Sequence, residues 1–189
     1  MTRSGLALLG ALAWMQVSGP TDPTSAGRPP SVSAPAPEAV SDAGAEFDFD
    51  ADAIIAILRE VNPRLSEGEL RRITSAILTN SAKYGIDPQL VTAVMWEESG
   101  ARPWVRSPKG AIGLMQVMPF MSSEMEIAGN LTTIENNVEA GCLILSDNIR
   151  RLGVEDGISA YFWGSEIRGV SYLRRVLEKH ASLRRLSRS

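Results

Sequence analysis

Apolar residues in the second part of the chain recur with the period of an α-helix. One such stripe has successive spacings of 4, 3, 4 and 3 positions and consists of Val138, Cys142, Leu145, Ile149 and Leu152. This spacing places its members on one face of a helix that ends at Gly153. Between residues 47 and 186 no segment alternates apolar and polar residues for long, as a strand with one buried face would. The pattern therefore predicts an all-α domain.

Capping residues and helix breakers mark where the other helices begin and end. The sequence Ser-Glu-Gly-Glu at 66–69 is a capping box, which opens a helix that Gly85 ends. An Asp-Pro pair at 87–88 supplies an N-cap and a first-turn proline for the next helix, which ends near Ser99. Short helices are also expected at 53–61, 155–163 and 169–186, with a turn-rich loop at 100–112.

The first 46 residues have a different pattern. Arg3 precedes an apolar run of 13 residues, 5–17, which is shorter than the ~20 residues that a membrane-spanning helix needs. Residues 1–19 are therefore predicted to be an export signal peptide, cleaved after position 19 or as late as 26, with an uncleaved anchor as the alternative. Residues 20–46 are rich in Pro, Ala and Ser and predict a disordered, flexible linker. The helical domain is accordingly expected at 47–186.

Composition narrows the function classes. The chain of 189 residues has a formal net charge of −3, one cysteine and one histidine. A single cysteine, Cys142, cannot form an intramolecular disulfide or a multi-cysteine metal site, so no metal or cofactor is expected. The charge gives no support to a nucleic-acid partner. From Arg174 to Ser189 six basic residues stand against Glu178 alone, 6 − 1 = +5, which indicates either a solvated helix end or contact with an anionic surface.

Two adjacent glutamates, Glu97 and Glu98, lie near the end of the helix that follows the Asp-Pro pair. At about 100° per residue, the apolar positions of this helix centre near ~70°, Glu98 falls near ~80° and Glu97 near ~340°. Glu98 is therefore expected on the core-facing side and Glu97 at the surface. A carboxyl group in apolar surroundings has a raised pKa and can act as a general acid near neutral pH. A solvated or ion-paired glutamate at a helix end is the alternative interpretation of Glu98.

Motifs from Glu98 onward are similar to those of one enzyme family. The first group runs in the order Glu98-Ser99, Ser107-Pro108, Gly110-Ala111, Gly113-Leu114-Met115-Gln116 and Met118-Pro119. The second group consists of the segments 136–143, 160–161 and 172–177. Together they resemble the signature of the soluble lytic transglycosylase (SLT) family over about residues 70–182. The resemblance implies a small lysozyme-like helical domain of the goose type that cleaves peptidoglycan.

By this resemblance Glu98 is the single catalytic acid and base. It would protonate the glycosidic oxygen between N-acetylmuramic acid and N-acetylglucosamine, and then accept the proton of the muramoyl 6-hydroxyl as that group attacks the anomeric carbon. The product is a 1,6-anhydro sugar, and neither a metal nor a cofactor takes part. The positions that would bind the glycan are Ser99, Ser107, Gln116, Met118, Tyr161 and Tyr172.

The resemblance also implies where the protein works. Its substrate would be the glycan strands of peptidoglycan, and its location the periplasm or cell envelope after export. The small domain, the linker and the basic C-terminal tail suggest docking near an envelope-spanning machine or on an anionic surface.

The chain departs from the family pattern at one motif. The family's Ala-Tyr-Asn-Ala-Gly is Ala-Tyr-Phe-Trp-Gly at 160–164 here. Either Trp163 stacks on sugar or the two new rings pack in the core. Trp104 is similarly either an aromatic platform or a cover for its loop. His180 continues the apolar stripe of its helix and is expected to pack rather than to catalyse.

Two other functions stay open at this point. A hydrolytic muramidase would need a placed water and a second carboxylate, which the sequence cannot place near Glu98. A wall-binding or assembly module without activity would use the same cleft but cleave nothing.

Overall fold

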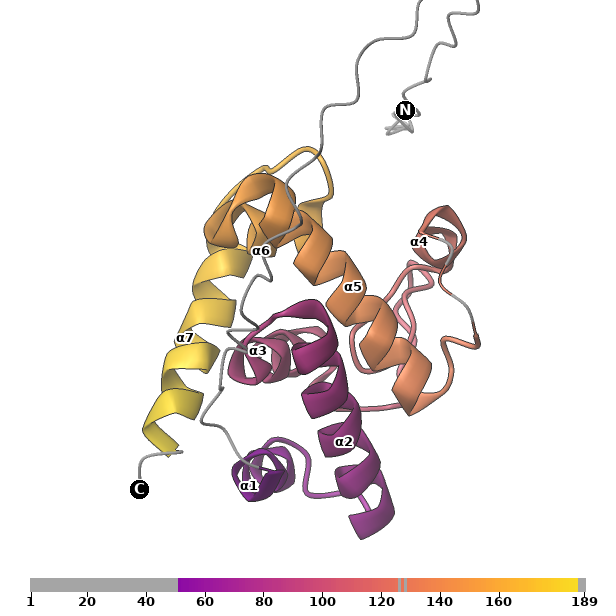
Figure 1. Cartoon of the computed structure of the whole chain (residues 1–189), viewed down its shortest axis with the longest axis vertical. Coiled ribbons are helices and arrows are strands. Elements are labelled where there is room, and N and C mark those ends of the chain that lie inside the picture. The colour runs from indigo at the N-terminus through magenta and orange to yellow at the C-terminus, as the bar shows by residue number, and fades with distance from the viewer. Residues whose placement is uncertain (1–50, 126, 128, 187–189) are drawn as a thin grey trace, which may run out of the picture. The chain divides into compact units, whose positions relative to one another are not determined.

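A computed structural model describes residues 51–125, 127 and 129–186. The predicted signal peptide (1–19) and linker (20–46) lie outside these residues. The described part is helical and contains no strand, only two isolated β-bridges, which confirms the all-α prediction. Its helices are α1 Ala51–Val61, α2 Glu67–Tyr84, α3 Pro88–Ser99, α4 Pro119–Glu124, α5 Ile134–Leu152, α6 Val154–Trp163 and α7 Ser171–Leu186 (Figure 1).

The predicted caps form as the sequence indicates. The Ser66 hydroxyl accepts the amide N–H of Glu69 at 3.3 Å, and the Glu69 carboxylate accepts the amide N–H of Ser66 at 2.8 Å. At the other end of α2, Gly85 takes a left-handed conformation with φ of 64°, which glycine adopts at little cost. Asp87 accepts the amide N–H of Gln89 at 2.8 Å and so caps α3. Local chemistry thus fixes where α3, the helix of the two glutamates, begins.

The core surrounds α3. Figure 1 shows this helix between α2 and α7, and it also packs against α1. Val91, Val94 and Met95 on α3 are fully buried. Removing such side chains from water contributes about 1.5–3 kcal/mol each to folding. The last turn of α3 is therefore held by a packed core before any site chemistry is considered.

The other helices pack around this centre in pairs. α5 lies against α2 and α6, and α7 lies against α3 and α6. Within the described ranges, no helix has the length and apolar content needed to cross a bilayer.

Candidate active site

Glu98 stands in the last turn of α3, which ends where Gly100 takes φ of 60° and its N–H bonds the Trp96 carbonyl. The side chain is partly buried. Burial raises the pKa of Glu98 from its ordinary 4.5 to about 7, because the charged form loses hydration. The hydrogen bond from Tyr172 and the charge of Arg175 act against this rise, and the charge of Glu97 adds to it. A carboxyl group with this pKa is substantially protonated near neutral pH.

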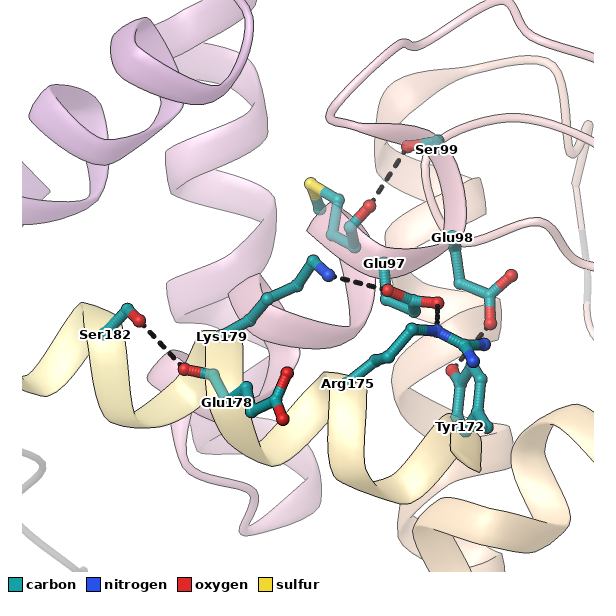
Figure 2. A network of polar contacts seen from close by, with 9 residues as sticks. Glu97, Glu98, Ser99, Tyr172, Arg175, Glu178, Lys179 and Ser182 are labelled. Carbon is teal, nitrogen blue, oxygen red and sulfur yellow. Dashed lines mark hydrogen bonds and ion pairs between the residues drawn. The ribbon is translucent and has the colours of Figure 1, made fainter. Parts of the chain in front are cut away.

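Tyr172, at the start of α7, touches Glu98 directly. Its hydroxyl donates a hydrogen bond of 2.6 Å to Glu98 Oε1, and the other carboxylate oxygen points away from the tyrosine (Figure 2). The tyrosine is only 1% exposed. Burial, followed by the negative charge of Glu98, raises the pKa of Tyr172 well above its usual range, so this phenol stays a hydrogen-bond donor.

Tyr161 on α6 is subject to the charge of the same carboxylate. Its hydroxyl donates to the Met115 carbonyl oxygen at 2.8 Å. Burial and then the charge of Glu98 raise the pKa of Tyr161 well above its usual range. Two predicted tyrosines from two helices are thus brought to Glu98, one in direct contact and one through its electrostatic field.

The Gly-Leu-Met-Gln segment at 113–116 forms a tight turn. Ile112 and Val117 exchange backbone hydrogen bonds of 3.0 Å on either side of it. Gly113 has φ of 74° and Gln116 has φ of 48°. A Cβ atom at position 113 would lie 2.6 Å from the side-chain nitrogen of Asn137, so only glycine fits both the conformation and the space.

Asn137 on α5 is the site-forming residue that sequence reasoning missed. Its Oδ1 accepts the Met115 amide N–H at 2.8 Å, and its Nδ2 donates to the carbonyls of Ile112 at 2.8 Å and Leu131 at 3.0 Å. It is 1% exposed, so these bonds replace water that the backbone groups have lost. One helix residue therefore holds the turn from inside.

Gly141 lies one helical turn after Asn137 and lets Met115 pack directly on α5. A Cβ atom there would lie 2.5 Å from the Met115 Cβ. The spacing of four between Asn137 and Gly141 was the available signal, because it places an amide and a gap on one helix face.

The predicted glycan contacts in the loop hold the loop itself. Gln116 donates through its Nε2 to the carbonyls of Gly113 at 2.9 Å and Val105 at 3.3 Å. The Ser107 hydroxyl accepts the Ala111 amide N–H at 3.0 Å. Met118 occupies the N-cap position of α4 and is half-buried. These side chains shape the turn, and Ser107, Gln116 and Met118 keep some exposure at its surface.

Ser99 faces inward. It is 1% exposed, and its hydroxyl donates to the Met95 carbonyl at 3.2 Å and accepts the Arg102 amide N–H at 3.3 Å. This placement argues against direct contact with a glycan and gives Ser99 a role in ending α3.

Glu97 differs from its expected surface position. Its side chain is only 13% exposed, and its two carboxylate oxygens pair with Arg175 and, at 2.7 Å, with Lys179 (Figure 2). Burial alone would raise the pKa of Glu97, but the two cations outweigh it and lower the pKa. The surface prediction was wrong because α7 covers this flank of α3.

The two rings that replace Asn-Ala in the family motif have different surroundings. Phe162 is 51% exposed and stacks on Tyr172, with ring centroids 4.9 Å apart and planes at 17°. Trp163 is half-buried, and its Nε1 donates to the Gly169 carbonyl at 3.1 Å. The aromatic surface beside the site is therefore that of Phe162.

The sequence also raised the roles of two other aromatic side chains, Trp104 and His180. Trp104 is 62% exposed. His180 Nε2 lies 2.9 Å from Asp87 Oδ2, and the ring joins α7 to the start of α3, as the packing interpretation expected.

Two hollows of the described residues lie away from Glu98. A hollow of about 480 Å³ between α2 and α5 is lined by ion pairs that include Arg72–Glu135 and Lys83–Glu139. A second, of about 560 Å³, lies beside Leu90, Leu177 and His180. Neither includes Glu98. Among the residues that the structure describes, no three His, Cys, Asp or Glu side chains gather as metal ligands.

Comparisons with known proteins identify the family of the chain. The family model of the transglycosylase SLT domain matches residues 75–179, more than half of the chain. A transglycosylase of Enterobacteria phage PRD1 is 36% identical over 86 residues, which are 45% of this chain and 32% of that protein. An endo-type membrane-bound lytic murein transglycosylase A of Klebsiella pneumoniae is 36% identical over 87 residues, 40% of this chain and 43% of that protein.

Among solved structures, an inactive mutant of the lytic transglycosylase Slt from Pseudomonas aeruginosa is 18% identical, with a TM-score of 0.44. The match covers 76% of this chain and 27% of that one. The chain thus spans less than half the length of these relatives. The family-model match carries the assignment: the chain belongs to the transglycosylase SLT domain family.

Proposed function

We propose that the protein is a lytic transglycosylase of peptidoglycan. It cleaves the β-1,4 bond between N-acetylmuramic acid and N-acetylglucosamine and leaves 1,6-anhydro-N-acetylmuramic acid ends. Family membership and the names of its relatives support this substrate class. The single observation that supports the mechanism is the state of Glu98. It is partly buried, its pKa is raised to about 7, and its carboxylate accepts a hydrogen bond from the Tyr172 hydroxyl.

Glu98 acts first as the general acid. The protonated carboxyl gives its proton to the glycosidic oxygen, and the bond between that oxygen and the anomeric carbon breaks. Its free-facing oxygen points away from Tyr172 (Figure 2) and is the one suited to this transfer. The Tyr172 hydrogen bond then stabilises the carboxylate that forms.

Glu98 acts next as the general base. The carboxylate takes the proton of the muramoyl 6-hydroxyl while that oxygen attacks the anomeric carbon, which closes the anhydro ring and restores the acid. Glycosidases with an external nucleophile need a second carboxyl group. In this mechanism the sugar supplies the nucleophile, so one carboxyl group serves both steps.

The state of Glu97 favours this mechanism over hydrolysis. It is adjacent to Glu98 in the sequence, but both of its oxygens are paired with cations of α7. A carboxylate held in two ion pairs is poorly placed to activate a water, which is what a hydrolytic muramidase would require.

The glycan contacts and the location remain part of the proposal. Ser107, Gln116 and Met118 would offer hydrogen bonds and an apolar wall along the turn, and Phe162 an aromatic face. Residues 1–19 would direct export, and residues 20–46 would tether the domain in the periplasm or cell envelope. The basic residues of α7 would favour an anionic surface or an envelope-spanning machine.

Digestion of purified peptidoglycan sacculi tests the function. The protein should release soluble fragments with anhydro ends by mass spectrometry, and Glu98→Gln should release none. A matched control is Glu60→Gln, an exposed position on α1, which should behave as the unchanged protein. Binding of sacculi without any release by the unchanged protein would support a wall-binding module instead.

A further inference from the structure

One face of α7 contacts the last turn of α3 through three polar side chains. Tyr172, Arg175 and Lys179 are separated by three and four positions, which aligns them along one side of the helix. Tyr172 meets Glu98, whereas Arg175 and Lys179 both meet Glu97 (Figure 2). One side of α7, which follows the two adjacent glutamates by more than 70 positions, therefore contacts both of them.

The contacts of Glu97 are more enclosed than a surface ion pair. The Glu97 side chain is 13% exposed and that of Lys179 23% exposed, while Arg175 is 45% exposed. The Lys179 ammonium also lies 5.6 Å from the centroid of the Trp96 ring. An exposed ion pair contributes little to stability, but a partly buried and doubly paired carboxylate constrains both helices.

Arg175 links this ion-pair cluster to the catalytic contact. Its guanidinium carbon lies 5.9 Å from the centroid of the Tyr172 ring, whose hydroxyl bonds Glu98. The cluster formed by Glu97, Arg175 and Lys179 thus sits directly beside the donor that contacts the proposed acid.

We propose that Glu97 is a positioning residue: by pairing with Arg175 and Lys179 it holds α7 where Tyr172 reaches Glu98, and it cancels positive charge beside Glu98. The inference rests on the proposed function, in which Glu98 is the acid. It assigns to Glu97 the task of setting the protonation of Glu98, not contact with the glycan.

The charged and titratable groups around Glu98 define the expected effect. They are Glu97 on α3, Tyr172 and Arg175 on α7, and Tyr161 on α6. The negative charge of Glu97 raises the pKa of Glu98, and the positive charge of Arg175 lowers it. Loss of Glu97 leaves two cations uncompensated and stabilises the Glu98 carboxylate. Loss of Arg175 does the opposite.

The test compares Glu97→Gln with Arg175→Gln. Glutamine keeps the size of Glu97 but has one acceptor oxygen where Glu97 uses two, so it retains one of the two contacts while the charge is removed. The alkaline fall of kcat should move to lower pH by about half a unit or more in Glu97→Gln, and to higher pH in Arg175→Gln. KM should change little, because neither side chain is assigned to the glycan. The double variant should return toward the original profile.

A matched control removes the same charge elsewhere. Glu135→Gln breaks the 2.8 Å ion pair with Arg72 between α2 and α5, and its profile should coincide with that of the unchanged protein. A merely structural role for Glu97 would lower kcat at every pH without moving the fall. The inference would be overturned if the alkaline fall of kcat stayed in place in Glu97→Gln, or if it moved in the same direction in Glu97→Gln and Arg175→Gln.

Failure of this inference can be told from failure of the proposed function. If the unchanged protein yields no anhydro products, the function is wrong, and carbon-13 NMR titration of the glutamate carboxyl groups still measures Glu98 in each variant. If the protein is active and Glu98→Gln is not, an unshifted Glu98 titration in Glu97→Gln counts against the inference alone. Should Glu97→Gln fail to fold, the opposite shift expected for Arg175→Gln decides.

Discussion

The Tyr172 hydroxyl lies 2.6 Å from Glu98 Oε1 and donates to it across 74 positions of sequence. The contact joins the first turn of α7 to the last turn of α3. It favours the carboxylate, and so it limits how far burial raises the pKa of Glu98.

Replacing this tyrosine tests the contact. In Tyr172→Phe the ring stays and the donor is lost, so the pKa of Glu98 rises further. The alkaline fall of kcat/KM should move upward by about one pH unit, because a hydrogen bond to a charged group is worth about 1.5–3 kcal/mol and solvent at this partly exposed group recovers some of it. The rate at the optimum should drop about tenfold, since the carboxylate that forms when Glu98 gives up its proton in the first step is less stable. A fall that stays in place or moves downward contradicts the assignment.

The raised pKa of Glu98 should also make the stability of the protein depend on pH. The pKa of Glu98 is about 7 in the folded state against an ordinary 4.5. Between these values the folded protein keeps a proton that the unfolded chain has released, so the free energy of unfolding falls as pH rises through this window. Glu98→Gln cannot ionise and escapes the loss. Its stability advantage over the unchanged protein should grow by about 2 kcal/mol between pH 4 and pH 8.

Urea unfolding at these two pH values measures the difference. Glu60→Gln, at an exposed position of α1, serves as the control and should show no comparable change. An equal stability difference at both pH values would mean that Glu98 is not perturbed in the folded protein.

The side-chain amide of Asn137 holds the turn at 113–116 from inside. Asn137→Ala removes three hydrogen bonds from buried or partly buried backbone groups, and we expect a loss of about 3 kcal/mol in the free energy of unfolding. Asn136→Ala is the matched control, because the Asn136 side chain, among the described residues, donates one long hydrogen bond of 3.4 Å to the Asn130 carbonyl; it should cost less than about 1 kcal/mol. Similar costs for the two variants would remove Asn137 from its assigned role.

The exposed face of Phe162 should bind sugar. Phe162→Ala is expected to raise KM for glycan strands about five- to tenfold, as expected for the loss of an aromatic contact, while Phe162→Trp should keep KM near its original value. The pH profile separates this role from support of Tyr172: a stacking contact with sugar leaves the alkaline fall in place, whereas displacement of Tyr172 moves it. An unchanged KM in Phe162→Ala would contradict the sugar contact.

The features that sequence predicted well depend on near neighbours in the chain. The caps at Ser66 and Asp87 involve residues two or three positions away, so their chemistry is visible in a short segment. The inward direction of Glu98 followed from the apolar positions of its own helix. The role proposed for Glu98 came from the resemblance to the family motifs.

The features that sequence missed depend on distant partners. Glu97 is covered by Arg175 and Lys179, which lie 78 and 82 positions later, and a helical wheel of α3 contains no trace of them. Asn137 reaches a turn 22 positions earlier, and its spacing of four from Gly141 did not by itself indicate that partner. Ser99 is the exception, because its hydroxyl bonds backbone groups only four positions before it and three after it; there the family motif, and not a distant partner, led to the expected glycan contact.

The fate of water in the cleavage reaction is the most direct test of a lone acid and base. Sacculi are digested in H₂¹⁸O, and the new muramoyl ends are analysed by mass spectrometry. The mechanism predicts 1,6-anhydro ends without ¹⁸O, because the 6-hydroxyl of the sugar and not water attacks the anomeric carbon. Reducing ends that carry ¹⁸O would show hydrolysis and contradict the account of Glu98 as a carboxyl group that works without a partner.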